Sequence, residues 1–282
     1  MLAPGAERMT ALKRFVAIRR AIASGAALLL IATANAAAER LPVGADDSTI
    51  TEELKAPEDP TIVKRRVWLD SEGNHFKHAG DDLDFTLGGI WSWAAPPRRD
   101  WAVRLKVPIR THFAGDDTYD RDRQGLGDVK LAAGGAVRLG DRWRAGGGVE
   151  MRFPTATNDL GANVWRPQLF GALAWDVTPR ITLSPSAEYN KSIAESRGAA
   201  RQEFLEMFFP VTFVRPGRWS ITPRYELKID FANNKRLTQS AKLSATKQLG
   251  ASPVGLTLSI KKPFDGGDKK FQVNFVTTYY FR

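Results

Sequence analysis

The sequence contains few of the side chains that enzymes use as nucleophiles, bases or metal ligands. Cysteine is absent, which excludes disulfides and thiolate metal sites. The three histidines are His75, His78 and His112. His112 precedes a loop with Asp116 and Asp117, so a His–Asp pair is conceivable, but no serine lies in a motif that would complete a hydrolase triad. We therefore expect no catalytic site.

Two short stretches have residues that bind metal ions in other proteins. "HFKH" at 75–78 offers two histidines, but a pair without a third ligand is usually solvated. The loop after His112 carries the aspartates Asp116, Asp117, Asp120 and Asp122. Such oxygens suit calcium, yet Arg121 and Arg123 lie among them. We expect both stretches to be solvated loops, and we predict neither a metal nor a cofactor.

Charged side chains recur instead at every second position of long alternating segments. In "VKLAAGGAVRL" (129–139), Lys130 and Arg138 fall on one face and Leu131 and Val137 on the other, because strand side chains point to opposite sides with period two. The charged faces are predicted to line a wet lumen and to set its selectivity. They carry Arg104, Lys106, Arg110, Lys130, Arg138, Arg144, Glu150, Arg152, Arg166, Glu188, Glu206, Arg224, Glu226 and Lys228.

The alternating segments define the fold class. Eleven of them follow one another between 83 and 281, joined by short turns, such as 140–141, that alternate with long loops, such as 114–127. Bacterial outer-membrane barrels have this pattern and an even number of strands, so a twelfth strand is required, and 61–70 is the candidate. We predict an all-β fold, an antiparallel up-and-down transmembrane β-barrel of about 12 strands, over 61–282.

Aromatic residues mark both ends of the uncharged faces. They are Trp101, Phe113, Trp143, Phe153, Trp165, Trp175, Trp219, Phe231, Phe271 and Phe281. Ten residues of a strand tilted by about 40° climb roughly 25 Å, the height of the apolar band between the aromatic girdles of such barrels. We predict that this set forms the two membrane girdles. A soluble barrel or sandwich, the alternative, has no reason to place aromatics at both ends of its apolar face.

The start of the chain predicts export. Residues 1–38 combine basic residues, an apolar run and small residues, the layout of a secretory signal peptide, with cleavage expected among Ala36 to Ala38. The apolar run is short for the alternative, a retained membrane anchor. Residues 39–60 are acidic and contain proline, so we expect a disordered periplasmic tether. A short helix is the alternative, since Thr49 and Glu52 have the spacing of a capping box.

The last strand is expected to pair with the first, because an open sheet edge in lipid leaves backbone groups unpaired. Its outward face resembles the C-terminal recognition strand of outer-membrane barrels, although Arg282 follows the terminal aromatic residue. The expected partners are therefore outer-membrane lipid and lipopolysaccharide, the barrel-assembly machinery and a small-molecule solute. The net charge of +10 would suit nucleic acid, but an exported chain rarely meets it, and none is expected.

A narrower resemblance rests on two motifs. "GLGDVKLAAGGAVRL" (125–139), followed by "RFPTATND" (152–159), resembles the family of outer-membrane channels grouped with the meta-pathway of phenol degradation (MetA-type transporters). Its members open a strand with Gly-Leu-Gly-Asp and follow a glycine-rich hairpin with Pro-Thr-Gly; Ala156 stands at that glycine here. The likeness covers about 125–282 and implies passage of small, aromatic molecules across the outer membrane.

The arginine-rich faces lead to an expected function. We predict a passive channel in the bacterial outer membrane for small solutes, anionic or aromatic carboxylates, because an excess of arginine along a narrow lumen favours anions. One alternative is a non-conducting structural barrel, since buried Arg and Glu side chains can cross-link a twelve-strand lumen. A lipid-modifying barrel enzyme is a further alternative. The loop 114–127 is long enough to seal the lumen from inside.

Overall fold

The computed structural model describes residues 47–76, 81–95, 98–113, 122–196, 198–250, 252–264 and 269–281. Within these ranges one helix, α2 (Asp47–Lys55), precedes all of the strands. The strands are β1 (Arg66–Phe76), β2 (Asp81–Ala95), β3 (Arg99–Phe113), β4 (Arg123–Leu126), β5 (Lys130–Arg138), β6 (Trp143–Arg152), β7 (Val164–Thr178), β8 (Ile181–Leu183), β9 (Ser186–Lys191), β10 (Ala194–Glu195), β11 (Glu203–Arg215), β12 (Trp219–Asp230), β13 (Arg236–Gln248), β14 (Val254–Pro263) and β15 (Lys269–Tyr280). The expected signal peptide, 1–38, lies outside the described residues.

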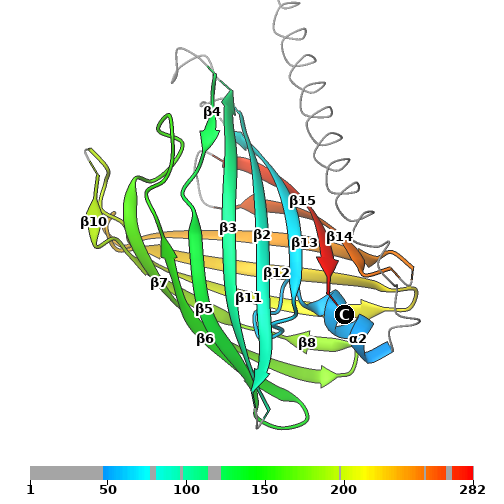
Figure 1. Ribbon diagram of the computed structural model, residues 1–282. Coiled ribbons are helices and arrows are strands. Elements are labelled where there is room, and N and C mark those ends of the chain that lie inside the picture. Colours follow the sequence, from blue (N-terminus) through cyan, green and yellow to red (C-terminus); the bar gives the residue numbers. More distant parts are fainter. Residues whose placement is uncertain are drawn as a thin grey trace, which may run out of the picture. The chain divides into compact units, whose positions relative to one another are not determined.

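The strands form one antiparallel sheet that closes on itself (Figure 1). β1 pairs with β2 on one side and with β15 on the other, from Arg66 opposite Tyr280 to His75 opposite Phe271. β8 and β9 both pair with β7 and β11, so together they form one interrupted strand of the wall. β4 extends the β3 edge beyond β5. The wall therefore has twelve strands, and the predicted fold class is confirmed.

The first strand begins later than the sequence pattern predicted. β1 spans Arg66–Phe76 and not 61–70. Thr61 instead belongs to the preceding segment, where its backbone N–H and its hydroxyl donate to the Asp59 carboxylate at 2.9 and 2.6 Å. These local hydrogen bonds hold the backbone in a turn, as side-chain oxygens often do in competition with sheet pairing.

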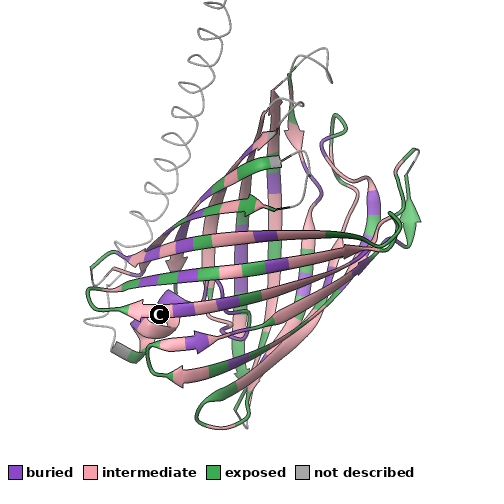
Figure 2. Ribbon diagram, turned by 180° about the vertical axis from the view of Figure 1, so that it is seen from behind, coloured by how far each residue is buried: buried purple, intermediate pink, exposed green. Residues whose placement is uncertain are grey.

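The two faces of the wall are inverted relative to those of a soluble protein. Large apolar side chains such as Leu105 (41% exposed) and Leu258 (50%) point outward, whereas inward residues such as Thr222, Ser244 and Thr257 are buried. Figure 2 shows how the burial class changes from residue to residue along the strands. Soluble barrels bury their apolar face and expose their polar one. The outward apolar face is thus of the kind that meets lipid.

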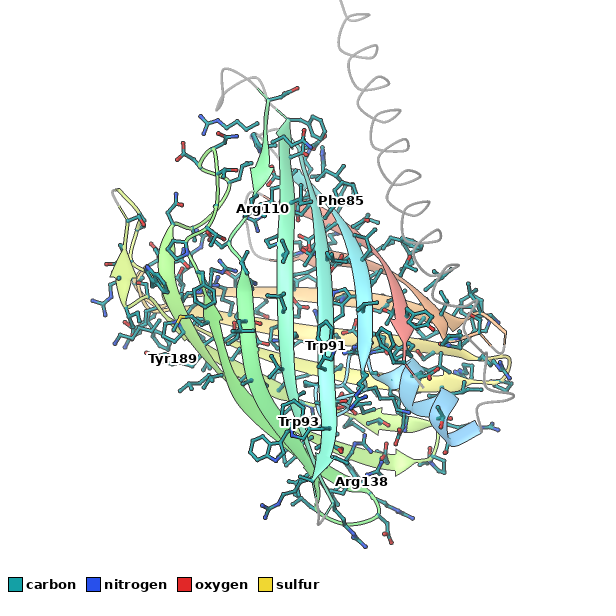
Figure 3. All side chains as sticks on the ribbon, viewed as in Figure 1. Phe85, Trp91, Trp93, Arg110, Arg138 and Tyr189 are labelled. Carbon is teal, nitrogen blue, oxygen red and sulfur yellow. The ribbon has the colours of Figure 1, made fainter. Side chains whose placement is uncertain are left out.

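The predicted girdle residues lie on this outward face. Eight of them are exposed, namely Trp101, Trp143, Trp165, Trp175, Trp219, Phe231, Phe271 and Phe281, while Phe113 and Phe153 are half-buried. Trp143 and Trp175 stack on neighbouring strands with ring centroids 5.5 Å apart. Trp91 and Trp93 of β2 also point away from the wall (Figure 3). The girdle role of the whole set remains a prediction.

Glycines in β5 and β6 make room inside the barrel. A Cβ atom at Gly134 would lie 3.1 Å from Phe170 Cζ, and one at Gly148 would lie 2.9 Å from it. The Phe170 ring therefore rests on bare backbone, and the Arg104 guanidinium lies 5.8 Å from its centroid. The weak strand propensity of these glycines is offset by the close approach they permit.

Candidate functional site

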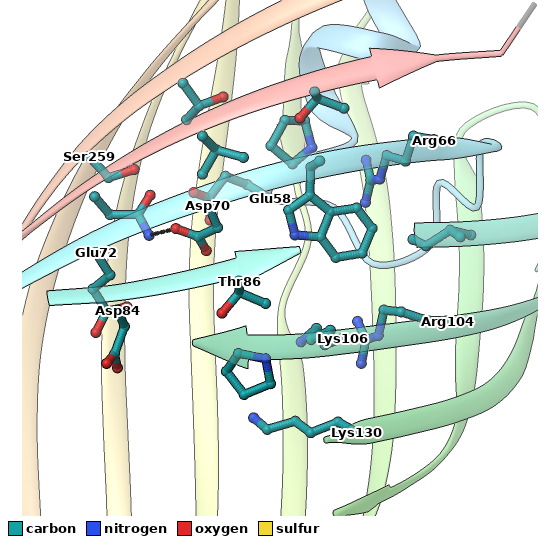
Figure 4. Close-up of a pocket in the computed structure, with 18 of the residues that line it drawn as sticks. Glu58, Arg66, Asp70, Glu72, Asp84, Thr86, Arg104, Lys106, Lys130 and Ser259 are labelled. Carbon is teal, nitrogen blue, oxygen red and sulfur yellow. Dashed lines mark hydrogen bonds between the residues drawn. The ribbon is translucent and has the colours of Figure 1, made fainter. Parts of the chain in front are cut away.

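A cavity of about 410 Å³ lies inside the barrel. Its charged lining comes from the segment after α2, from Asp128 before β5, and from the strands β1, β2, β3, β5, β6 and β13. The cations are Arg66, Arg104, Lys106, Arg110, Lys130, Arg152 and Lys242, and the acids are Glu58, Asp70, Glu72, Asp84 and Asp128. Figure 4 shows Glu72 and Asp84 on one side and Arg104, Lys106 and Lys130 on the other, with Glu58 and Asp70 between them. Seven cations against five acids give the lining a net positive charge.

Four of the predicted lumen cations form a row across adjacent strands, here called the basic row. Lys106 on β3 lies opposite Lys130 on β5, which lies opposite Arg152 on β6, which lies opposite Arg166 on β7. The first three line the cavity. Like charges directly opposite one another destabilise a sheet, so the basic row carries an electrostatic cost.

One buried carboxylate, Glu150, partly offsets that cost. Its Oε2 accepts a hydrogen bond from Arg104 Nη2 at 2.7 Å, and Lys106 Nζ lies 3.8 Å from the same oxygen. Lys130 Nζ lies 4.0 Å from Oε1. Arg166 donates to the Gln202 side chain and lies over the Phe204 ring, 4.9 Å from its centroid. Glu150 therefore lies among the cations that the sequence predicts on this wall.

Three acids on β1 and β2 form a second group, here called the acid cluster: Asp70, Glu72 and Asp84. Glu72 lies directly opposite Asp84. Asp70 accepts a hydrogen bond from Asn274 Nδ2 at 2.7 Å, and Glu72 accepts one from Asn74 Nδ2 at 2.9 Å. Arg110 Nε approaches Asp84 Oδ2 at 3.3 Å.

The sequence patterns did not single out this cluster. Asp70 stood at the end of the predicted first strand, and Glu72 fell in the loop expected after it. The signal was nevertheless present. Trp68, Asp70 and Glu72 alternate with Val67, Leu69 and Ser71, which is the period-two pattern of a strand.

The later strands pair their charges more fully. Arg224 Nε donates to Glu226 at 2.7 Å, and Lys261 Nζ lies 2.5 Å from the other oxygen of that carboxylate. Lys228 Nζ lies 3.9 Å from Glu206. Glu188 faces Glu206 across the β9–β11 pair. These ion pairs leave this side of the lumen close to balanced in charge.

The segment from α2 to Lys64 lies across one end of the lumen. Polar contacts tie it to strands all around the wall: Arg138 of β5, Arg144 of β6, Asp176 of β7, Ser220 of β12, Ser244 of β13 and Tyr280 of β15. A chain that reaches strands on every side must cross the opening between them. The expectation of a disordered tether over 39–60 is therefore wrong where the structure describes it, and the helix alternative is present.

Arg138 and Arg144, predicted to line an open lumen, bind this segment. Arg138 Nη2 lies 2.8 Å from Glu52 Oε1, and Lys64 Nζ lies 2.9 Å from Glu52 Oε2. Partial burial raises the pKa of Glu52, but these two cations lower it by more, so its pKa lies below the ordinary value. Arg144 contacts both Asp59, at 2.9 Å, and Asp176. The sequence patterns gave no sign of these acidic partners.

The histidines pair with acids other than those expected. His112 Nδ1 contacts Asp82 on the neighbouring strand, and His75 Nδ1 lies 2.7 Å from Asp81. His78, Asp116, Asp117 and Asp120 lie outside the described residues. Across the described ranges, no three His, Asp or Glu side chains gather as a metal site. The part of the 114–127 loop that is described, β4, extends along β3 rather than into the lumen.

Comparisons with known proteins find similarity of structure without similarity of sequence. No protein-family model and no curated protein matches the chain, so the resemblance to the meta-pathway channels remains a prediction. An outer-membrane channel from Pseudomonas putida F1 superposes with a TM-score of 0.67 at 15% identity, over 78% of this chain and 96% of that one.

Two further structures share the fold. The NanC porin superposes with a TM-score of 0.53 at 14% identity, over 76% of this chain and 99% of that one. The translocator domain of the autotransporter NalP from Neisseria meningitidis gives 0.52 at 12% identity, over 81% and 93%. The fold of this chain is that of bacterial outer-membrane β-barrels.

Proposed function

We propose that the protein is a passive channel in the bacterial outer membrane for small carboxylates. The observation that carries the proposal is the internal cavity of about 410 Å³ with an excess of cations in its lining. Rings and rows of charge determine which ions enter such pores, and arginine and lysine favour anions. The fold supports the proposal, because it is shared with an outer-membrane channel and a porin.

The outer surface fits the proposed location. Apolar side chains cover the outward face, and exposed tryptophans such as Trp143 and Trp219 lie at strand ends, which suits contact with lipid and lipopolysaccharide. The outward residues Phe271, Val273 and Phe281 of the last strand are exposed. This apolar face of the last strand is the feature through which the barrel-assembly machinery would recognise the chain.

The segment across one end of the lumen limits what can pass. It leaves a cavity within the barrel rather than an open tube, so the solutes are small. Arg104, Lys106 and Lys130 would attract their carboxylate groups on the way through. Catalysis plays no part in this proposal.

Reversal potentials in planar bilayers test the proposal. Across a potassium chloride gradient, the purified protein should give an anion-selective current. Lys106→Gln should lower the anion-to-cation permeability ratio by about twofold, because it removes a lumen cation. Lys191→Gln, on a rim of the wall beside Glu203, is the matched control and should leave the ratio unchanged. A cation-selective current, or a folded barrel without any current, would contradict the proposal.

A further inference from the structure

We propose that the cavity binds a small solute that carries both a carboxylate and an ammonium group. The inference rests on the proposed channel function and names its substrate class. It comes from two groups of like charge that meet in one cavity: Lys106, Lys130 and Arg152 of the basic row, and the acid cluster (Asp70, Glu72 and Asp84). Arg152 of the basic row has no acid within 4.0 Å among the described residues, and Asp70 and Glu72 of the acid cluster have no lysine or arginine nitrogen at that distance, whereas Asp84 has Arg110 at 3.3 Å.

The basic row has more positive charge than the protein neutralises. Glu150 is 3.8 Å from Lys106 and 4.0 Å from Lys130, and its shortest contact goes to Arg104 instead. Arg152 has no carboxylate oxygen within 4.0 Å among the described residues, and its buried Nε has no hydrogen-bond partner there. Lysine and arginine donors that lack a carboxylate partner suit an oxyanion, which accepts charge-assisted hydrogen bonds from them.

The acid cluster has the opposite shortage. Within the part of the chain that the structure describes, neither Asp70 nor Glu72 has a lysine or arginine nitrogen within 4.0 Å, and they accept hydrogen bonds from the side-chain amides of Asn274 and Asn74. Glu72 also faces Asp84 directly across the β1–β2 pair. Carboxylates without a cationic partner suit an ammonium group, which has three hydrogen-bond donors.

The strand register keeps the two groups from neutralising one another. Lys106 lies opposite Gly88 on β2, whereas Asp84 lies four residues along the same strand, a rise of roughly 13 Å at about 3.3 Å per residue. A glycine thus occupies the place next to the basic row where an acid would form an ion pair. This is a separation between backbone positions, and a solute that carries both charges would lie between the side chains that extend from them.

Apolar side chains in the same cavity suit the carbon skeleton of such a solute. Trp68 lies opposite Gly88, and a Cβ atom at Gly88 would overlap the indole ring. The indole therefore lies against β2 near the level of the basic row, and Pro108 and Val276 also line the cavity. A simple anion complements only the basic row, and a simple amine complements only the acid cluster. A solute with both charges complements both, which is how electrostatics gives specificity.

Titration calorimetry on the purified full-length protein in detergent tests the inference. The probes are 4-aminobutyrate, butyrate and butylamine, which differ only in their charged groups. We expect 4-aminobutyrate to bind at least about tenfold more tightly than either of the others, because both charged ends gain partners. Equal affinity for butyrate would overturn the inference, as would the absence of measurable binding of 4-aminobutyrate.

Variants at two positions, Glu72 and Lys130, separate the role of each group. Glu72→Gln keeps the acceptor for Asn74 but removes the charge, and should bring the affinities for 4-aminobutyrate and butyrate to within about twofold of one another. Lys130→Arg should retain the preference, and Lys130→Gln should weaken 4-aminobutyrate binding about tenfold. Lys261→Gln, a lumen lysine paired with Glu226 outside this cavity, is the control with unchanged binding. An unchanged preference in Glu72→Gln would contradict the inference.

The two proposals fail in distinguishable ways. Binding is measured at equilibrium and does not require passage through the lumen. An anion-selective current without preference for 4-aminobutyrate would overturn the substrate class alone. Preferential binding without any current would overturn the channel alone.

Discussion

Glu58 shows how one carboxylate joins the N-terminal segment to the barrel. It is buried and accepts hydrogen bonds from Arg224 Nη1 at 2.8 Å and Ser244 Oγ at 2.7 Å, while Lys242 Nζ lies 3.0 Å away. Burial raises the pKa of Glu58, but Arg224 and Lys242 together lower it by more, so its pKa lies below the ordinary value of 4.5. The ionised form therefore favours docking of the segment.

The sign of this pKa shift predicts a dependence on pH. Because the docked pKa is depressed, the stabilisation is complete above the ordinary pKa of 4.5 and is lost as the pH falls through the docked value. At pH 7, Glu58→Gln should weaken docking by roughly 3–5 kcal/mol, the usual cost of removing one partner of a buried ion pair. Limited proteolysis of the segment measures this loss.

A matched variant and a pH series complete that test. Glu206→Gln removes a lumen acid that contacts Lys228 rather than the segment, so its proteolysis rate should equal that of the wild type. Wild-type protein should approach the Glu58→Gln rate only in acid, below pH 4.5. Equal rates for Glu58→Gln and wild type at pH 7 would show that Glu58 does not hold the segment.

At the scale of the element, α2 depends on the barrel. The helix has nine residues, and isolated helices of fewer than about 12 residues are marginal in water. The barrel completes its C-terminal end, where carbonyl groups lack partners within the helix. Tyr280 Oη donates to the Glu53 carbonyl at 2.8 Å, and Ser220 Oγ donates to the Leu54 carbonyl at 2.9 Å. The helix is thus a consequence of docking.

Removal of residues 47–60 should open the lumen. The strands do not need this segment for their backbone pairing, so the barrel should still fold and migrate differently on a gel before and after boiling. Its single-channel conductance should rise by at least about threefold, since the solvated cross-section of a pore limits the flow of ions. An unchanged conductance in a folded deletion variant would show that the segment does not restrict passage.

The dependence of α2 on contacts with the barrel explains which parts of the structure the sequence could and could not predict. Strand number and facing were predictable because lipid outside and polar groups inside impose a period of two on every strand. The docked segment was not, because 39–60 read alone is acidic and proline-containing, and its partners Arg144 and Arg224 lie far away in the chain. Likewise, nothing local in "AAGGAV" shows that the Phe170 ring rests on Gly134.

At the scale of the whole molecule, closure and the inverted faces determine which solvent the barrel needs. Pairing of β1 with β15 leaves no open edge in the wall, as a hydrocarbon environment requires. The outward face, with Leu105, Leu131 and Leu258 exposed, has no partner within the chain. Water would be a poor solvent for so much contiguous apolar surface. The fold is therefore complete only when lipid or detergent covers it.

A charge placed on the outward face tests directly whether that face meets lipid. Leu105 lies near the middle of β3 and is 41% exposed. In a soluble barrel, Leu105→Arg would be neutral or would improve solubility, but at the midplane of a bilayer it should destabilise the fold by about 2–4 kcal/mol. Leu139→Arg, just beyond the end of β5 at the rim, is the matched control and should cost about 0–1 kcal/mol. Urea unfolding in phospholipid vesicles measures both variants, and equal stabilities would place the outward face in water.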